Sequence, residues 1–201
     1  MSAFPDTPKT LLSRMAAQVT GESEANWVRF FDLYQPVICK FAEHVGAKGE
    51  SEDVAQDVFV KLVEAFRNGR YQPSRGRFRA YLAAMIRHEV VNRWQKGMAR
   101  AADRHVSLDD DDFPLEVGVP SETAAVIDMK WRLARHAAAI EHVLTKTALS
   151  QRTKDIYRAY VLEERPIGEV AKAFQVPNNS VSQTKTRVER MIADYEAMFS
   201  D

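Results

Sequence analysis

Apolar residues recur at spacings of three and four through nearly every patterned segment of the chain, which is the period of an amphipathic helix. One such stripe runs through residues 27–41, with Pro36 inside it, and others run through residues 54–66, 78–94 and 126–144. No run of alternating apolar residues between turn signals is long enough to favour a sheet. The pattern therefore predicts an all-α fold.

Hydroxyl and amide side chains mark several predicted helix starts. Ser51 and Ser150 are expected to be N-caps, and Asn179 or Ser180 is expected to cap the last helix.

In the helix after Ser51, the face opposite the apolar stripe carries Asp53, Gln56, Asp57, Val60, Lys61 and Glu64. In the next helix Trp94 is expected on the buried side. In residues 126–144 the inward face is expected to be Val126, Met129, Leu133, Ala137, Ile140 and Leu144.

Charge is segregated along a chain whose 28 basic and 28 acidic residues cancel. Residues 67–104 hold ten basic and two acidic side chains, whereas residues 105–122 hold six acidic side chains and no Lys or Arg. The basic block is interleaved with aromatic residues, a mixture that suits single-stranded nucleic acid. A solvated helix face is the alternative interpretation of such a block.

The acidic stretch includes prolines and a glycine and has no helical period, which is typical of a linker. It divides the chain into two predicted helical domains. The expected organisation is an N-terminal extension (1–23), a helical domain (24–100), an acidic linker (101–122) and a second helical domain (123–201).

Residues 166–191 have the dimensions of a helix-turn-helix: a short helix, a break at residues 175–179 and a second helix. The predicted exposed face of the second helix shows side chains that suit phosphates and base edges. These are Ser182, Gln183, Lys185, Thr186, Arg187 and Arg190. A generic pair of packed helices is the alternative.

Sites for catalysis, metals or cofactors find no support in the sequence. Cys39 is the single cysteine, so neither a disulfide within the chain nor a multi-cysteine metal site is expected. Residues 88–92 (HEVVN) end in asparagine where a zinc signature needs its second histidine. The sequence has no glycine-rich phosphate loop, signal peptide or apolar run of spanning length. We expect a soluble, cytoplasmic protein that is not an enzyme and has no cofactor, small-molecule substrate or membrane partner.

Two sets of motifs give the chain a family resemblance. Residues 51–62 (SEDVAQDVFVKL) and 78–82 (FRAYL) are similar to motifs of the second conserved region of the sigma-70 family of bacterial RNA polymerase initiation factors. Residues 169–171 (EVA) and 185–188 (KTRV) resemble motifs of the family's helix-turn-helix. Over residues 24–198 the order and spacing resemble the two-domain extracytoplasmic-function group.

The resemblance implies core RNA polymerase and promoter DNA as partners, and leaves open an anti-sigma protein. It implies polymerase contacts at Asp53, Gln56 and Asp57. The implied −10 contacts are Arg70, Tyr71, Gln72, Arg75, Arg77, Arg79, Arg87, His88, Arg93 and Lys96. The implied −35 contacts are Asn179, Ser180, Ser182, Gln183, Lys185, Thr186, Arg187 and Arg190.

One departure concerns the helix that follows residues 78–82. Many family members have asparagine at the position of His88 and aspartate at that of Asn92, so base-specific contacts there are less well supported than backbone contacts. Two other functions remain open. A stand-alone helix-turn-helix regulator would bind duplex operators without polymerase, and a helical adaptor would bind proteins alone.

Overall fold

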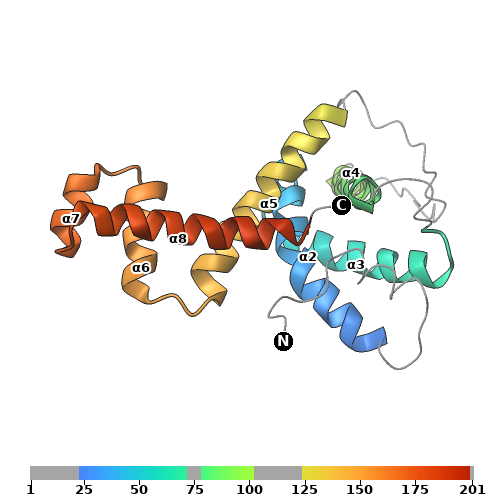
Figure 1. The fold of residues 1–201 in the computed structure, drawn as a ribbon. Coiled ribbons are helices and arrows are strands. Elements are labelled where there is room, and N and C mark those ends of the chain that lie inside the picture. The colour runs from blue at the N-terminus through green and yellow to red at the C-terminus, as the bar shows by residue number, and fades with distance from the viewer. Residues whose placement is uncertain (1–22, 72–77, 102–123, 200–201) are drawn as a thin grey trace. The chain divides into compact units, whose positions relative to one another are not determined.

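A computed structural model describes residues 23–71, 78–101 and 124–199, and within these ranges the regular structure is entirely helical (Figure 1). This confirms the all-α prediction. The elements are α2 (Ser23–Val45), α3 (Ser51–Arg67), α4 (Phe78–Ala101), α5 (Ala124–Lys146), α6 (Gln151–Tyr157), the π-helical turn η2 (Arg158–Leu162), α7 (Ile167–Phe174) and α8 (Asn178–Ala197). The predicted N-terminal extension up to residue 22, and residues 102–122 of the predicted linker, lie outside the described residues.

The chain divides into two compact units within α5, between Arg135 and His136. We call them the N-terminal unit and the C-terminal unit. The domain boundaries given above stay a prediction, because most of the acidic stretch that motivated them lies outside the described residues.

The core of the N-terminal unit forms where α2, α3 and α4 pack on one another. Phe30 of α2 is fully buried and contacts Phe59 of α3 and Phe78 of α4, with ring centroids 5.8 and 5.7 Å apart. Helix α2 continues through Pro36 from Ser23 to Val45. Helix α3 buries the apolar face that its sequence period predicted, and so does α4 from Phe78 to Val90.

The predicted inward face of α5 is wrong at two positions. Met129 and Leu133 are about half exposed, whereas Trp131 and Ala134 are buried. The Trp131 ring lies 5.5 Å from that of Phe41. Apolar residues occur on several sides of this helix, so burial of its largest ring sets a register that spacing alone does not reveal.

The helix starts also differ from the predictions. Ser51 is the first residue of α3 rather than its cap, and its hydroxyl donates a hydrogen bond to Glu43 Oε1 at 3.3 Å. Pro177 precedes α8, so neither Asn179 nor Ser180 caps that helix. The prediction for Ser150 is confirmed, because its hydroxyl accepts a hydrogen bond from the Thr153 backbone N–H at 3.2 Å.

In the C-terminal unit, α6, η2, α7 and α8 share a small cluster of buried aliphatic side chains. Buried Ile156 and Ala159 come from α6 and η2, and they pack with Val170 of α7 and Val181 of α8. Since α7 and α8 both bury apolar side chains in this cluster, the turn between them is held from both sides.

Gln175 makes that turn in the left-handed region, with φ 51°. Its N–H donates to the Lys172 carbonyl, and the Val176 N–H donates to the Ala171 carbonyl at 3.0 Å. This paired pattern is the Schellman motif, whose left-handed residue is usually glycine. Gly69 has the same place after α3, with φ 65°.

Replacing Gln175 with glycine should therefore stabilise the fold. A non-glycine residue in the left-handed region costs about 1–2 kcal/mol, and the greater backbone freedom of glycine in the unfolded chain cancels part of the gain. We expect Gln175→Gly to raise the free energy of unfolding by about 0.5–1 kcal/mol in urea denaturation. The reciprocal variant Gly69→Gln should lower it, and a loss of stability in Gln175→Gly would contradict this explanation.

Candidate functional site

The first candidate surface is the exposed face at the start of α3. Val54 and Val58 are fully buried, and this fixes the rotation of the helix so that Asp53 and Gln56 are exposed. The Asp53 side chain is 66% exposed and that of Asp57 is 47% exposed. The prediction that this face points outward is confirmed. We call it the acidic surface, defined by Glu50, Asp53, Gln56 and Asp57.

Arg93 of α4 lies against the acidic surface and pairs with four carboxylates. Its Nη2 is 2.5 Å from Asp57 Oδ2, and its Nη1 is 3.6 Å from Glu50 Oε2 and 3.9 Å from Asp53 Oδ2. Its Nε is 3.6 Å from Glu89 Oε1. Burial alone would lower the pKa of Arg93, but the hydrogen bond to Asp57 and the surrounding carboxylates raise it.

Glu89 extends this network to a second cation. The Glu89 residue is 6% exposed, and its Oε2 accepts a hydrogen bond from Lys61 Nζ at 2.8 Å. Sequence reasoning missed both pairs across α3 and α4. The one available signal was the i, i+4 spacing of Glu89 and Arg93 on a helix. Arg93, predicted as a −10 contact, is thus already surrounded by carboxylates, which makes it a weaker candidate for phosphate than an exposed arginine.

The rest of the predicted −10 set is only partly within the described residues. Gln72, Arg75 and Arg77 lie outside them. Arg70 and Lys96 are exposed. Arg87, also predicted as a −10 contact, is only 7% exposed, which makes it a weaker candidate for phosphate than Arg70 or Lys96. It follows the buried residues Met85 and Ile86 along α4, and its own burial removes most of its surface from solvent.

Tyr71 follows the end of α3 and joins an aromatic cluster. Its ring is 4.9 Å from that of Phe66, 5.5 Å from Phe78 and 5.3 Å from Tyr81. The Arg70 N–H donates to the Ala65 carbonyl, so the turn after α3 sets the path of the chain into this cluster. Tyr71 therefore offers a partly buried ring edge at the surface rather than a freely projecting side chain.

Two further −10 candidates, Arg79 and His88, lie on α4 and have polar neighbours. Arg79 Nη2 lies 3.7 Å from Asp128 Oδ1. His88 lies 3.2 Å from the side-chain amide of Asn92. Burial and the nearby charge of Lys61 lower the pKa of His88, although Glu89 opposes the shift, so its neutral form is favoured.

The second candidate surface is a stripe along α8. Val181 and Val188 are fully buried, and the residues on the opposite face are all exposed. We call these residues the α8 stripe: Asn179, Ser182, Gln183, Thr186, Arg187 and Arg190. Their spacings of three, four and seven place them on one side of the helix.

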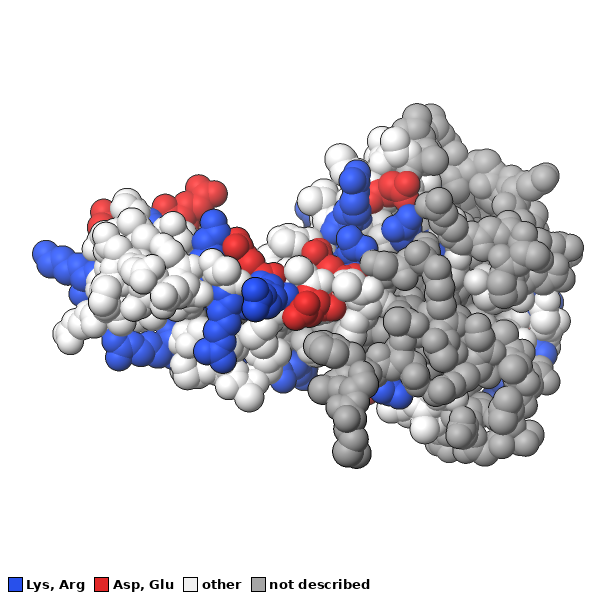
Figure 2. Space-filling model, viewed as in Figure 1, with Lys and Arg blue, Asp and Glu red and all other residues white. Residues whose placement is uncertain are grey.

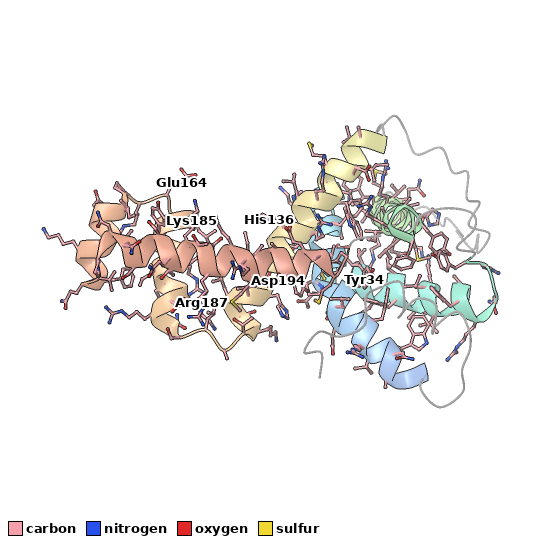
Figure 3. The ribbon with its side chains drawn as sticks, viewed as in Figure 1. Tyr34, His136, Glu164, Lys185, Arg187 and Asp194 are labelled. Atoms are coloured by element: carbon pink, nitrogen blue, oxygen red, sulfur yellow. The ribbon has the colours of Figure 1, made fainter. Side chains whose placement is uncertain are left out.

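Lys185 does not share this stripe, although the sequence pattern grouped it there. Two residues along a helix turn the side chain to nearly the opposite side, and Figure 3 shows Lys185 and Arg187 projecting to different sides of α8. Lys185 Nζ lies 6.0 Å from the centre of the Tyr160 ring and 3.7 Å from Glu189 Oε1. Ser180 is half-buried at the edge of the stripe.

The character of both surfaces is polar and charged. Figure 2 shows Lys and Arg side chains at several places on the drawn face of the C-terminal unit, together with acidic side chains along its upper edge. Every described helix falls short of the length or the apolar character that a membrane span requires. The described residues bring no three His, Cys, Asp or Glu side chains together as a metal site would need.

Helices α2, α3 and α4, two of which carry the acidic surface and its arginine, have a counterpart among protein families. Residues 30–100 match Sigma-70 region 2. The match covers about a third of the chain and includes α3, nearly all of α4 and most of α2. This match supports the interpretation of the chain as a sigma-70 family sigma factor, with a role in transcription initiation and DNA binding. That family is not enzymatic and implies core RNA polymerase and promoter DNA as partners. A search of curated proteins found no match.

The Arg93–Asp57 pair predicts a measurable coupling between α3 and α4. Because Asp57 is about half exposed, we expect the coupling energy from Arg93→Gln, Asp57→Asn and the double variant to be about 1 kcal/mol. The measurement is urea denaturation of the four proteins. The exposed pair Lys185–Glu189 is the matched control, with a coupling of at most about 0.5 kcal/mol. Additive effects of the Arg93 and Asp57 changes would show that the pair contributes nothing.

Proposed function

We propose that the chain is a two-domain sigma factor of the extracytoplasmic-function group, acting in the cytoplasm. It binds core RNA polymerase through the acidic surface and directs it to promoters through two separate DNA contacts. The observation that carries the proposal is the combination of two features in one chain. Residues 30–100 match Sigma-70 region 2, and the C-terminal unit presents the polar, basic α8 stripe.

The polymerase contact is assigned to Asp53, Gln56 and Asp57. Two of the three are well exposed, and Asp57 keeps about half of its side-chain surface in solvent while it pairs with Arg93. Carboxylates at such a surface pair with basic residues of a partner, which gives both specificity and fast association.

The −10 contact is assigned to the region from the end of α3 into α4. Among the described candidates, Arg70 and Lys96 are exposed, whereas Tyr71 and Arg79 are partly buried. Gln72, Arg75 and Arg77 remain candidates from the segment between the two helices. Arginine with aromatic rings suits an unpaired strand, because bases stack on rings while cations neutralise phosphates.

The −35 contact is assigned to α7 and α8 as a helix-turn-helix, with α8 as the recognition helix. The α8 stripe presents hydroxyl and amide groups beside two arginines, the side chains that read base edges in a major groove and hold phosphates.

Each unit alone should bind DNA weakly, because joining two sites in one chain raises the effective concentration of the second only when both can engage.

Removing the acidic surface should weaken polymerase binding. We expect Asp53→Ala with Gln56→Ala to lower the affinity of the full chain for core RNA polymerase at least tenfold, measured by fluorescence titration. Both residues are exposed, so the unfolding transition should stay unchanged. Asp194→Ala, an exposed carboxylate of α8, is the control. Equal affinity of the double variant and the original chain would refute this assignment.

Removing the arginines of the α8 stripe should remove promoter selectivity. We expect Arg187→Ala with Arg190→Ala to reduce initiation at least tenfold at promoters that depend on the −35 element, in transcription with core enzyme. If both contact phosphates, the salt slope of promoter binding should fall by about two. Arg132→Ala with Lys146→Ala removes the same charge from exposed positions of α5 and should have little effect. Unchanged transcription from these promoters in the α8 variant would disprove the role.

A further inference from the structure

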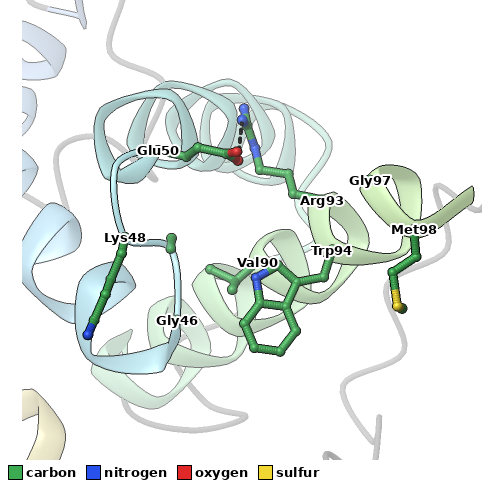
Figure 4. A pocket seen from close by; sticks show the side chains of 9 residues that line it. Gly46, Lys48, Glu50, Val90, Arg93, Trp94, Gly97 and Met98 are labelled. Atoms are coloured by element: carbon green, nitrogen blue, oxygen red, sulfur yellow. Dashed lines mark ion pairs between the residues drawn. The ribbon is translucent and has the colours of Figure 1, made fainter. Parts of the chain in front are cut away.

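A pocket of about 350 Å³, lined by both apolar and charged side chains, opens beside the acidic surface (Figure 4). Its lining includes Val90, Trp94 and Met98 of α4 and the backbone of Gly46 and Ala47 after α2. Trp94 is 57% exposed and Met98 is 66% exposed, so the expectation that Trp94 lies on the buried side of α4 is wrong. Two large apolar side chains are thus left in water next to a concave surface.

Gly46 fixes the position of the Trp94 ring. Its φ is 118°, and a Cβ atom built there would lie 2.6 Å from Trp94 Cζ2, closer than real side chains approach. Glycine is needed for both reasons, because only it adopts this backbone freely and leaves room for the ring. The indole therefore lies against the backbone with much of its surface open to solvent, in a position that needs little ordering on binding.

The pocket is continuous with the acidic surface. Glu50 and Arg93 line the pocket, and their ion pair is drawn in Figure 4. The same Arg93 reaches Asp53 and Asp57 on α3. A partner that pairs with these aspartates therefore lies next to Arg93, which lines the same pocket as Trp94.

The charge around the pocket selects the kind of partner. The pocket lining itself holds Glu50, Arg93 and the exposed Lys48. With the neighbouring network included, the four carboxylates that pair with Arg93 outnumber the three cations Arg93, Lys61 and Lys48. This surplus of negative charge favours a basic protein surface and opposes the phosphates of DNA.

We propose that the pocket receives an apolar side chain, flanked by basic residues, from the surface of core RNA polymerase that binds the acidic surface. This inference rests on the proposed function and extends it. A stable interface buries about 800 Å² on each partner, more than three polar side chains provide. Binding energy concentrates on buried aromatic anchors, so Trp94 would be the centre of the contact and the carboxylates its charged rim.

The test compares two methionines in full-length chains titrated with core RNA polymerase. Met98→Ser should weaken binding about fivefold, and Trp94→Ala about tenfold or more, because truncation at an interface centre commonly costs more than 1 kcal/mol. Met129→Ser is the matched control: Met129 is 48% exposed on α5 and outside the pocket lining, so its affinity should be unchanged. Met98 is largely exposed, so its variant should fold even if Trp94→Ala loosens the contact with Gly46.

Several results would overturn the inference. If Met98→Ser and Trp94→Ala bind core enzyme normally but the holoenzyme binds promoter DNA less well, the pocket serves DNA. If they instead abolish self-association in sedimentation, it binds a second copy. Should both bind normally while Asp53→Ala with Gln56→Ala loses affinity, the pocket proposal alone fails. If the aspartate and glutamine changes also leave affinity intact, the proposed polymerase surface fails with it.

Discussion

Burial of one apolar stripe per helix determines which polar side chains of this protein reach the surface. In α3, burial of Val54 and Val58 turns Asp53 and Gln56 outward. In α8, burial of Val181 and Val188 turns the residues of the α8 stripe outward. A one-residue shift in either helix would rotate its surface by about 100° and disperse the proposed contacts. The packing of the two cores is therefore also what arranges the proposed functional residues.

Charge in the N-terminal unit is arranged by contacts between helices rather than by the net balance of the chain. Arg93 belongs to the basic block of the sequence, yet it pairs with carboxylates of α3, α4 and the turn that precedes α3. One arginine thus joins the proposed polymerase surface to the helix that carries the proposed −10 contacts. The pocket beside it places exposed aromatic and thioether groups at the edge of the same surface.

The sequence pattern predicted which side chains are exposed where the helical repeat alone determines this. It failed where contacts between distant parts of the chain determine the exposure. The outward face of α3 and the exposed stripe of α8 follow from a 3.6-residue repeat, and both were predictable. The inward face of α5 was not, because burial of Trp131 against Phe41 sets its register. The exposure of Trp94 depends on a backbone approach at Gly46, some 50 residues earlier, and the role of Arg93 depends on carboxylates of another helix. Nothing in their local sequence distinguishes these residues from ordinary core or basic positions.

If the chain is a sigma factor, it gives promoter specificity to core RNA polymerase, and in vitro transcription of genomic DNA measures this property. The reaction contains core enzyme with or without the full chain, and the 5′ ends of the transcripts are mapped. We expect a set of new start sites that appear only with the chain and share two upstream sequence elements. Identical start sites in both reactions, from a chain that is folded and binds DNA, would contradict this expectation and favour a stand-alone regulator.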